Sequence, residues 1–287
     1  MSYTIRELKN SEFPPLLKEI PDPPKKLFCA GTLPPAENKI LCVVGSRKGS
    51  DYGREVCEQM IAGLRGFPIT IVSGLALGID SLAHRAALES GLQNIAIPGS
   101  GLDPKVLYPS SHIHLAEEII EKGGALLSEF ENDFRAAPWS FPQRNRIMAG
   151  MSHAAFIVEA EARSGTLITA RLAADYNRDV LTVPGSIFSP NSEGPNMLIK
   201  LGAVPVTSPE DILKTLGFEV VERRKLYDSY ENLSPEEKKI VGLLTNPMSR
   251  DELIRALNVP ASQVNMILSA MEIKGLIAES MGEIRLN

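Results

Sequence analysis

The stretch "ILCVVGSRKGSDYG", residues 40–53, has the pattern that opens an α/β domain. Its first five residues are all apolar, which predicts a strand buried on both faces. Gly45 follows directly and suits a tight turn, and Ser50 or Asp51 can cap a helix after it. A buried strand, a glycine turn and a capped helix together indicate the first unit of a Rossmann-like fold.

The same alternation continues along the chain. Segments with helical spacing, such as Cys57, Met60, Ile61 and Leu64, separate further short apolar runs. These runs are "ITIVS" (69–73), "IAI" (95–97), "ALLSEF" (125–130), "AAFIVEA" (154–160), "VLTVP" (180–184) and "VPVTS" (204–208). Continuous apolar strands separated by helices predict an α/β, doubly wound, mainly parallel sheet with helices on both faces.

Composition shifts divide the chain into four parts. Residues 1–39 are rich in proline, which predicts an extended segment packed on the main domain. Residues 40–217 form the Rossmann-like domain, and the charged residues 218–232 read as a linker. Residues 233–287 predict three helices and a short hairpin around Gly282, which is a winged-helix domain. Its first helix has a capping box of Ser234 and Glu237, with Pro235 at the first helical position.

Bulk composition favours a soluble cytoplasmic protein. The net charge of −5 argues against a wholly basic nucleic-acid coat protein, although a local basic patch remains compatible with it. Cys29, Cys42 and Cys57 form no metal-type pair, and sparse cysteines favour a reducing compartment. No segment has the apolar length of a signal peptide core or a membrane span, and no metal or cofactor is expected.

The turn at Gly45 predicts an anion site that is unsuited to a dinucleotide. A G-x-G-x-x-G fingerprint would fall on Gly45, Arg47 and Ser50, so an arginine stands where the second glycine is needed. Arg47 blocks close approach of a pyrophosphate, but its forked guanidinium is a good phosphate donor. The next strand ends in Ser73 and Gly74 rather than in the acid that would hold a ribose.

Two further loops have the same form. In "SGLALGIDSLAHRAAL" (73–88), Gly74 and Gly78 free the backbone, and Asp80 or Ser81 is expected to cap a helix that begins near residue 82. In "EAEARSGTLITA" (159–170), Gly165 opens another helix. Helix N-termini attract anions, and ligands of such sheets bind at the carboxyl edge. Adjacent phosphate-sized sites are therefore predicted there.

The segment "RAAPWSFPQRNRIMAGMSH" (135–153) adds basic and aromatic side chains. From residue 134 to 158 it holds Arg135, Arg144 and Arg146 and no acidic residue. Arginines beside aromatic rings are typical of single-stranded nucleic-acid sites. Trp139 is more simply interpreted as a core anchor, whereas for Phe141 base binding and packing stay equally open.

These motifs, together with "GSGLDPKVLYP" (99–109), "LSEF" and "VPG", resemble the DNA-processing protein A (DprA/Smf) family in order and spacing over nearly all of residues 40–217. The resemblance implies a non-enzymatic protein that binds single-stranded DNA in a basic pocket. It also implies protection of incoming DNA and loading of a RecA-type recombinase during natural transformation. Many members carry a SAM-like domain at the N-terminus, and the residues before Phe13 are too few for one.

The resemblance also implies the site residues. Those that match the family's motifs are Gly45, Ser46, Arg47, Ser73, Gly74, Ala76, Gly78, Phe141, Arg144, Asn145, Arg146, Ser164, Gly165 and Thr166. After "LYP" many members have a lysine and an asparagine, where this chain has Ser110 and His112, and Lys105 is the cation nearby that can substitute. Family members form dimers through the last part of the Rossmann domain, which here corresponds to helical residues around 197–201 and 212–216.

Two other interpretations remain open. A lysine-decarboxylase-like phosphoribohydrolase would need a catalytic glutamate where this chain has Thr169, although Glu159 and Glu161 lie just upstream. Alternatively, the winged helix could read duplex DNA as a regulator does. From residue 233 onward, however, six basic residues face seven acidic ones, so little counterion release is available. This domain is therefore expected to bind duplex DNA weakly at best and to contact protein.

Overall fold

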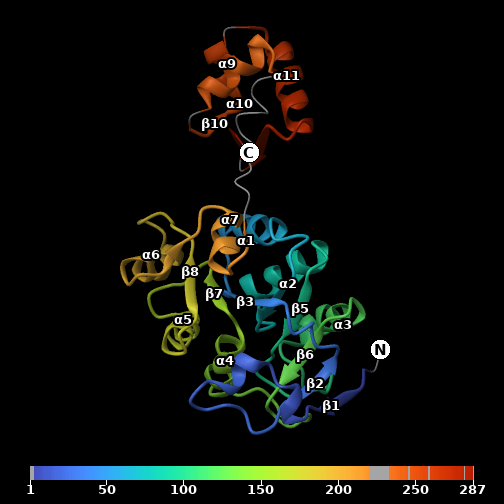
Figure 1. Ribbon diagram of the computed structural model, residues 1–287. Helices are drawn as coiled ribbons and strands as arrows, with labels where there is room; N and C mark the ends of the chain where they lie inside the picture. Colours follow the sequence, from blue (N-terminus) through green and yellow to red (C-terminus); the bar gives the residue numbers. More distant parts are fainter. Residues whose placement is uncertain (1–2, 220–232, 245, 258, 281, 287) are drawn as a thin grey trace. The chain divides into compact units, whose positions relative to one another are not determined.

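A computed structural model describes residues 3–219, 233–244, 246–257, 259–280 and 282–286 (Figure 1). The chain divides into two compact units, residues 1–219 and 220–287. Each unit is described by itself. The charged stretch interpreted as a linker lies, apart from residues 218 and 219, outside the described residues.

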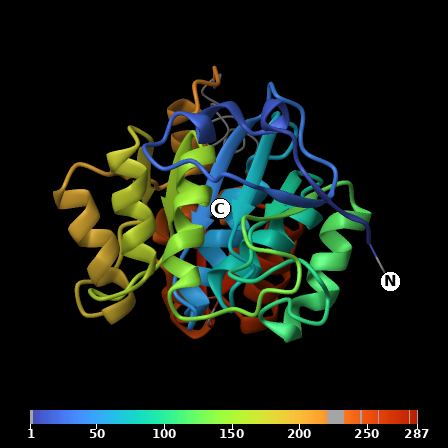
Figure 2. The ribbon, with the colours of Figure 1, turned by 90° about the horizontal axis from the view of Figure 1, so that it is seen from below.

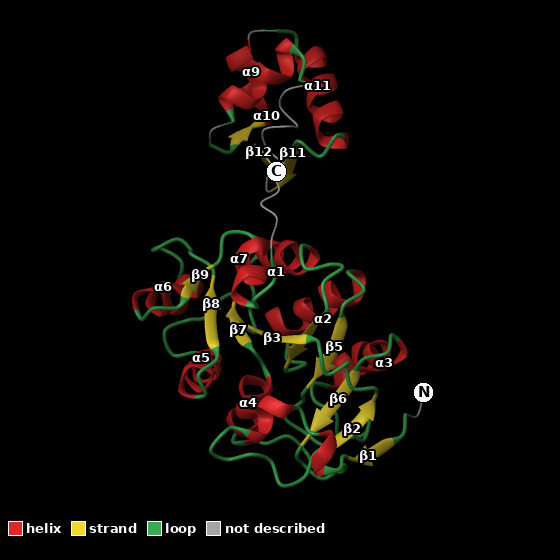
Figure 3. Ribbon diagram, in the orientation of Figure 1, coloured by secondary structure: helices red, strands yellow, loops and turns green. Residues whose placement is uncertain are grey.

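The larger unit is built on one sheet, in which nine strands are described in the order β1-β2-β6-β5-β4-β3-β7-β8-β9 (Figure 3). From β6 to β9 all neighbours pair in parallel, whereas β1 and β2 are antiparallel. The strands are β1 (Ile5–Glu7), β2 (Phe28–Gly31), β3 (Lys39–Val44), β4 (Ile69–Ser73), β5 (Gln93–Ala96), β6 (Ala125–Ser128), β7 (Ala154–Ile157), β8 (Asp179–Thr182) and β9 (Val204–Pro205). All seven predicted strands are present.

Helices cover both faces of this sheet, as the doubly wound pattern predicted. The helices are α1 (Asp51–Ala62), α2 (Ile79–Glu89), α3 (Ile113–Glu121), α4 (Ser140–Met151), α5 (Thr166–Asp175), α6 (Glu193–Lys200) and α7 (Pro209–Thr215). Helix α1 packs on α2 and α2 on α3, whereas α4 and α5 lie side by side on the other face (Figure 2). The chain reverses its direction of travel across the sheet between β3 and β7, which is the switch point where ligands of such folds bind.

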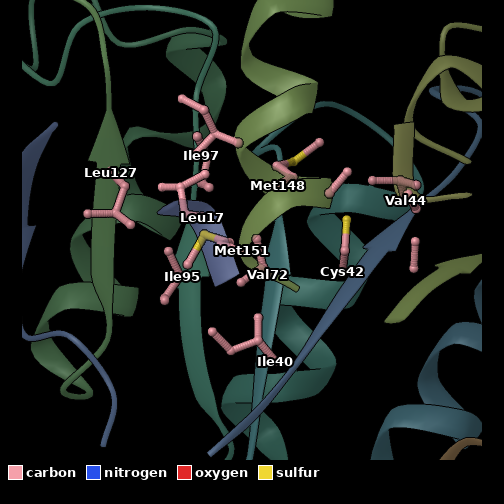
Figure 4. Close-up of a cluster of buried hydrophobic side chains, with 14 of the residues drawn as sticks. Leu17, Ile40, Cys42, Val44, Val72, Ile95, Ile97, Leu127, Met148 and Met151 are labelled. Atoms are coloured by element: carbon pink, nitrogen blue, oxygen red, sulfur yellow. The ribbon is translucent and has the colours of Figure 1, made fainter. Parts of the chain in front are cut away.

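Two apolar clusters lie on opposite faces of the sheet. On one face, the alternate β3 residues Ile40, Cys42 and Val44 point toward α4 and belong to the same cluster as its residues Met148 and Met151 (Figure 4). On the other face, Ala96 and Leu126 meet Leu115 and Ile119 of α3. The remaining members of both clusters are equally buried, so the parallel strands are covered on both sides, as their continuous apolar runs predicted.

The N-terminal segment is more integrated than the proline content suggested. It contributes β1 and β2, and β2 pairs antiparallel with β6, Phe28 opposite Ser128. Its short 3-10 helices, η1 (Asn10–Glu12) and η2 (Pro15–Lys18), lie on either side of Pro14. Leu17 and Leu27 are fully buried in the apolar cluster that faces α4. An extended surface segment would leave these leucines exposed; here they close the end of the core.

The last helices of this unit differ in exposure. On α6 and the neighbouring β9, Met197, Leu201 and Val204 are 41%, 76% and 37% exposed. On α7, Ile212 and Leu216 are buried, because this helix packs against α1. The apolar side chains around 212–216 therefore face the interior of this unit, whereas those around 197–201 are exposed.

The smaller unit has the winged-helix architecture. Its elements are α9 (Pro235–Leu243), β10 (Met248–Ser249), α10 (Arg250–Leu257), α11 (Ala261–Ile273), β11 (Ile277–Ser280) and β12 (Glu283–Leu286), with sheet order β10-β12-β11. The predicted capping box is present, since the Ser234 Oγ accepts from the Glu237 N–H and the Ser234 N–H donates back to the Glu237 carboxylate. The strand β10 was not predicted.

Within the residues that the structure describes, no helix is long and apolar enough to cross a lipid bilayer. The same residues contain no group of three or more His, Cys, Asp or Glu side chains placed to hold a metal ion. All three cysteines are free and buried, and burial raises the pKa of the Cys29 thiol to about 11.

Candidate nucleic-acid interface

A pocket of about 420 Å³ opens at the carboxyl ends of β3 and β7, the switch point of the sheet. Four loops or helix ends that are far apart in the sequence contribute to it. The residues that line it are Val44, Gly45, Ser46, Arg47, Lys48, Ala76, Asp80, Phe141, Pro142, Arg144, Asn145, Met148, Glu161, Ser164, Gly165, Thr166, Ile168 and Thr169. The structure thus brings together most of the residues that the family resemblance implied.

The loop after β3 is held from below by the loop after β4. The Ile79 N–H donates to the Ser46 carbonyl at 3.1 Å, and the Ser46 Oγ accepts from the Lys48 N–H at 3.1 Å. At Gly78, where φ is +76°, a Cβ would lie 2.3 Å from the Ser46 carbonyl oxygen. This glycine is therefore needed for the two loops to touch, not for a phosphate to approach.

Arg47 and Phe141 form the rim of the pocket. The Arg47 guanidinium carbon lies 5.0 Å from the centre of the Phe141 ring, a cation–π contact. On its other side Phe141 meets Tyr108, with ring centres 5.7 Å apart. A second, smaller hollow adjoins the first and shares Arg47, Ala76 and Phe141 with it; its further lining residues are Gly74, Leu77, Tyr108 and Pro109.

The loop after β7 supplies the opposite wall. The Thr166 Oγ1 donates to the Gly45 carbonyl at 3.1 Å, which ties this wall to the first loop. Gly165 is the N-cap of α5 and has no side chain, but the Ser164 Oγ accepts from the Thr166 N–H at 3.1 Å at the start of the helix. A Cβ at Gly165 would meet nothing within 4 Å, and this residue lines the pocket, so the positive end of the helix dipole lies at the pocket wall.

The N-terminus of α1, by contrast, is already occupied. Ser50 caps it, as predicted, but the Ser50 N–H also donates to the Glu159 carboxylate at 3.0 Å, and the Ser50 hydroxyl donates to the same carboxylate. Glu159 is 2% exposed and Gly53 packs directly on it. An internal carboxylate therefore fills the anion site expected at this helix.

Arg144 lies beneath the pocket and forms its floor. Its side chain is buried and donates to the Ile97 carbonyl, and its guanidinium fits against Gly74, where a Cβ would overlap it at 1.8 Å. Burial raises the pKa of the Asp80 carboxyl above its ordinary value, and the Arg144 charge opposes that rise. Burial likewise lowers the pKa of Arg144 while Asp80 acts in the opposite direction.

The sequence suggested that Asp80 caps α2, but it does not. The helix begins at Ile79 with Gly78 as its N-cap and no side-chain cap. The Asp80 carboxylate instead accepts from the Gly74 N–H at 3.2 Å, holding the loop after β4 in place. The physical reason is that the helix already begins at Ile79, so Asp80 lies within its first turn, where its carboxylate is buried and favoured by the charge of Arg144.

Several implied residues lie outside the pocket. Arg146 pairs with Glu129 and donates to the Asp22 carbonyl at 2.7 Å, so it fastens the N-terminal segment to α4. The Ser73 hydroxyl is buried and donates to the Val43 carbonyl. Lys105 is exposed, but it is not among the residues that line either hollow.

Trp139 is not the core anchor that seemed the simpler interpretation. Its side chain is 56% exposed and packs by its edge against Phe130 and Phe134. Phe141, for which both roles stayed open, faces the pocket and contacts Arg47.

Sequence reasoning also missed residues that the structure places at the site, among them Lys48, Leu77 and Tyr108. Lys48 lines the main pocket, and Leu77 and Tyr108 line the second hollow. Lys48 could have been found as the second cation of the loop, whereas nothing in the local pattern of Leu77 or Tyr108 shows that Phe141 would lie beside them.

A pocket with cationic and aromatic side chains at the switch point of a Rossmann-like sheet, together with a separate winged-helix unit, defines a two-unit α/β protein whose pocket is chemically suited to anions. The chain belongs to the family described as DNA recombination-mediator protein A, whose model matches residues 4–217. A second model, the DprA winged helix domain, matches residues 225–283. The resemblance seen in the motifs is thereby confirmed.

Curated relatives and solved structures agree with this membership. The chain is 40% identical to protein Smf of Escherichia coli over 290 residues, 95% of this chain and 75% of that protein. It is 42% identical to DNA processing protein DprA of Streptococcus pneumoniae over 202 residues, 70% of either chain. The solved structure of the Streptococcus pneumoniae protein superposes with a TM-score of 0.69 at 39% identity, covering 75% of each chain.

A second solved structure is that of DNA processing protein A from Helicobacter pylori, described for its single-stranded DNA binding mode. It superposes with a TM-score of 0.66 at 30% identity and covers 75% of this chain and 96% of that one.

Proposed function

We propose that this protein binds single-stranded DNA through the pocket at the switch point. The observation that carries the proposal is the placement of Arg47 over Phe141 where the two hollows join. One permanently charged donor for phosphate thus stands beside an aromatic ring that can stack with a base, the pairing that single-strand sites use. The single-stranded DNA binding described for the Helicobacter pylori relative supports the same ligand class.

The shape of the site favours a strand over a single nucleotide. The main pocket does not end at Phe141 but continues into the hollow beside Leu77 and Tyr108. Cations lie at Arg47 and Lys48, and the N-terminus of α5, which carries the positive end of the helix dipole, also lines the pocket. Two phosphate-binding elements across an open groove suit a ligand that enters and leaves, as a strand does.

The hydrolase alternative finds less support in these residues. Glu159 is one of the two glutamates near the position where a catalytic acid is expected. It is buried, and its carboxylate accepts a hydrogen bond from the Ser50 N–H at the N-terminus of α1. Thr169 occupies the expected position of that acid and is buried against the pocket. Glu161 lines the pocket, but the described lining residues include no histidine to pair with it, so it is a weak candidate for general acid–base chemistry.

Membership in a family described as recombination mediators supports a finer proposal. We infer that the bound strand is protected and passed to a RecA-type recombinase during recombination or natural transformation. A pocket that grips phosphates and stacks bases without reading base edges suits this role, because such binding tolerates any sequence.

The direct test compares single-stranded and duplex DNA on the full chain. We expect fluorescence anisotropy to show preferential binding of a labelled oligothymidylate, with an affinity that falls steeply as salt rises. Mixed-sequence oligonucleotides should bind comparably. Equal affinity for duplex, or release of free base from a nucleoside monophosphate, would overturn the proposal.

We further propose that two copies associate through an apolar surface on α6 and β9. This surface consists of Met197 of α6, Leu201 directly after it, Val204 of β9, and Ile187 and Phe188 in the turn between β8 and η4 (Pro190–Ser192). Ile187 and Phe188 are 81% and 89% exposed. Exposed apolar side chains beside an edge strand, here β9, are typical of a protein interface, and a two-fold dimer would bury them on both copies.

Leu201→Glu is expected to dissociate this dimer, because two carboxylates would be buried where two leucines met. Sedimentation velocity at micromolar concentration should report roughly half the mass of the parent. Lys200→Glu, an exposed neighbour on the same helix, should leave the mass unchanged and serves as the matched control. A Leu201→Glu protein with the mass of the parent would contradict the assignment.

A further inference from the structure

The third helix of the winged-helix unit, α11, exposes a stripe in which large apolar side chains alternate with serines. In a DNA-reading winged helix this element carries basic and amide side chains into a groove. Here Met266 and Ile273 are 72% and 87% exposed, while Val264, Leu268 and Met271 on the opposite side are buried in the core. The exposed stripe consists of Ser262, Met266, Ser269 and Ile273.

The surroundings of this helix do not suit DNA. Residues 261–273 contain no lysine or arginine and one glutamate, Glu272. In the described part of the unit, two basic side chains adjoin the helix. Lys274 binds Glu237 at 2.7 Å, and Arg250 pairs with Glu279 while donating to the Asn265 amide oxygen. Both positive charges are thus matched by carboxylates, and phosphate would gain little there.

The stripe is self-complementary. Its spacing of four, three and four residues is that of a helix-pairing seam. If two copies pair antiparallel, Ser262 lies opposite Ile273 of the second copy and Met266 lies opposite Ser269. Every layer then joins one large and one small side chain, which lets the helices approach closely without a gap or a clash.

The two serines are compatible with such a seam. The Ser269 hydroxyl can donate to the backbone carbonyl of Asn265 one turn earlier, so burying it leaves no unmatched polar group. Ser262 lies in the first turn of the helix, at the end of the seam, where its hydroxyl keeps access to water. Both side chains therefore act in the seam chiefly through their small size.

Polar groups at the border of the stripe fit the same arrangement. Antiparallel pairing brings Glu272 near the Asn265 side chain and the first turn of α11 in the second copy, and that turn has no acidic residue and no side-chain cap. A carboxylate is favourable at a helix N-terminus. Glu272 is the one charged residue within the helix, and the Arg250–Glu279 ion pair beside Asn265 brings one charge of each sign to this border.

We propose that α11 is a docking surface for the α11 helix of a second copy of this chain, paired antiparallel through the stripe. The contact uses none of the residues of the pocket or of the apolar surface on α6 and β9, and it does not depend on DNA binding. Because the stripe is short, the contact is weak alone, so covalent trapping is the appropriate measurement.

The test mixes two full-length variants, Met266→Cys and Ser269→Cys, under mild oxidation. Opposed positions in adjacent helices meet the geometry of a disulfide, and the three native thiols are buried and do not compete. We expect several-fold more covalent dimer in the mixture than in either variant alone. Adding Ile273→Asp to both chains should reduce the yield to background, because it places a carboxylate in each outer layer.

A mixture of Lys238→Cys and Lys239→Cys, exposed positions on α9, is the matched control and should give little dimer. Equal yields from the two mixtures, or a yield that Ile273→Asp does not change, would overturn the proposal. Protection of the Met266→Cys thiol from alkylation by duplex DNA would overturn it as well, because the stripe would then face a DNA groove.

Discussion

Arg47→Ala is expected to weaken binding of single-stranded DNA by about tenfold to a hundredfold, as a charge-assisted hydrogen bond of about 1.5–3 kcal/mol is lost. The effect is large because Arg47 belongs to both hollows and also covers the Phe141 ring. The slope of log affinity against log salt should fall by about 0.7, the contribution of one phosphate contact on a single strand. Anisotropy titrations of an oligothymidylate at several salt concentrations measure both quantities.

Three variants sharpen this experiment. Arg47→Lys keeps the charge but loses the planar fork, so its affinity should fall between those of the parent and Arg47→Ala. Arg85→Ala removes an exposed arginine on α2 outside both hollows and should change little. Glu161→Gln removes a carboxylate from the pocket wall and should strengthen binding a few-fold, since that carboxylate repels phosphate. Unchanged binding by Arg47→Ala would refute the proposed site.

Arg144→Ala is expected to act on stability instead, lowering the free energy of unfolding by about 3–5 kcal/mol. The cause is Asp80, which would remain buried with its charge unpaired. Urea denaturation followed by circular dichroism measures the loss. Arg47→Ala, whose side chain is exposed, should unfold at the urea concentration of the parent.

The pH dependence of this loss has a definite sign. Burial already holds the pKa of Asp80 above its ordinary 3.8, and removing Arg144 takes away a charge that opposes the rise. A folded state that binds more protons than the unfolded state loses stability as pH rises. The deficit of Arg144→Ala relative to the parent should therefore be largest at neutral pH and shrink in mild acid, as Asp80 becomes protonated.

Asp80→Asn supplies the control for this argument. Combined with Arg144→Ala it removes the unpaired charge, so the double variant should be more stable than Arg144→Ala alone, and the two substitutions should be non-additive. Additive losses, or a deficit that does not depend on pH, would show that Arg144 stabilises the fold by packing alone.

The strands and the first turn could be predicted from sequence because their signals are local. The five apolar residues before Gly45 and the helix cap at Ser50 lie within eleven residues of each other in the sequence (40–50). The strand and the cap are both found as expected. The pairing of β2 with β6 joins segments about a hundred residues apart, and no local pattern encodes it. The proline-rich segment was therefore interpreted by its composition and not by its partners.

At the candidate site, too, local sequence signals predicted the region but not the contacts between distant residues. Arg47, Arg144 and Arg146 are equally basic in the sequence, but one rims the pocket, one neutralises a buried aspartate and one fastens the N-terminal segment. What separates them is the charge of distant partners, Asp80 and Glu129, which only the folded chain brings near. A motif therefore indicated the right region and could not assign the role of each arginine.

The pairing of the N-terminal segment has a consequence for synthesis on the ribosome. The strand Phe28–Gly31 finds its partner only after residues 125–128 have emerged, and the backbone carbonyl of Leu16 accepts a hydrogen bond from Arg178. The N-terminal segment therefore cannot dock until most of the larger unit has been synthesised. Until then Leu17 and Leu27, which are buried in the folded protein, are exposed. During that interval the nascent chain exposes an apolar segment that chaperones can recognise, and its docking completes the core.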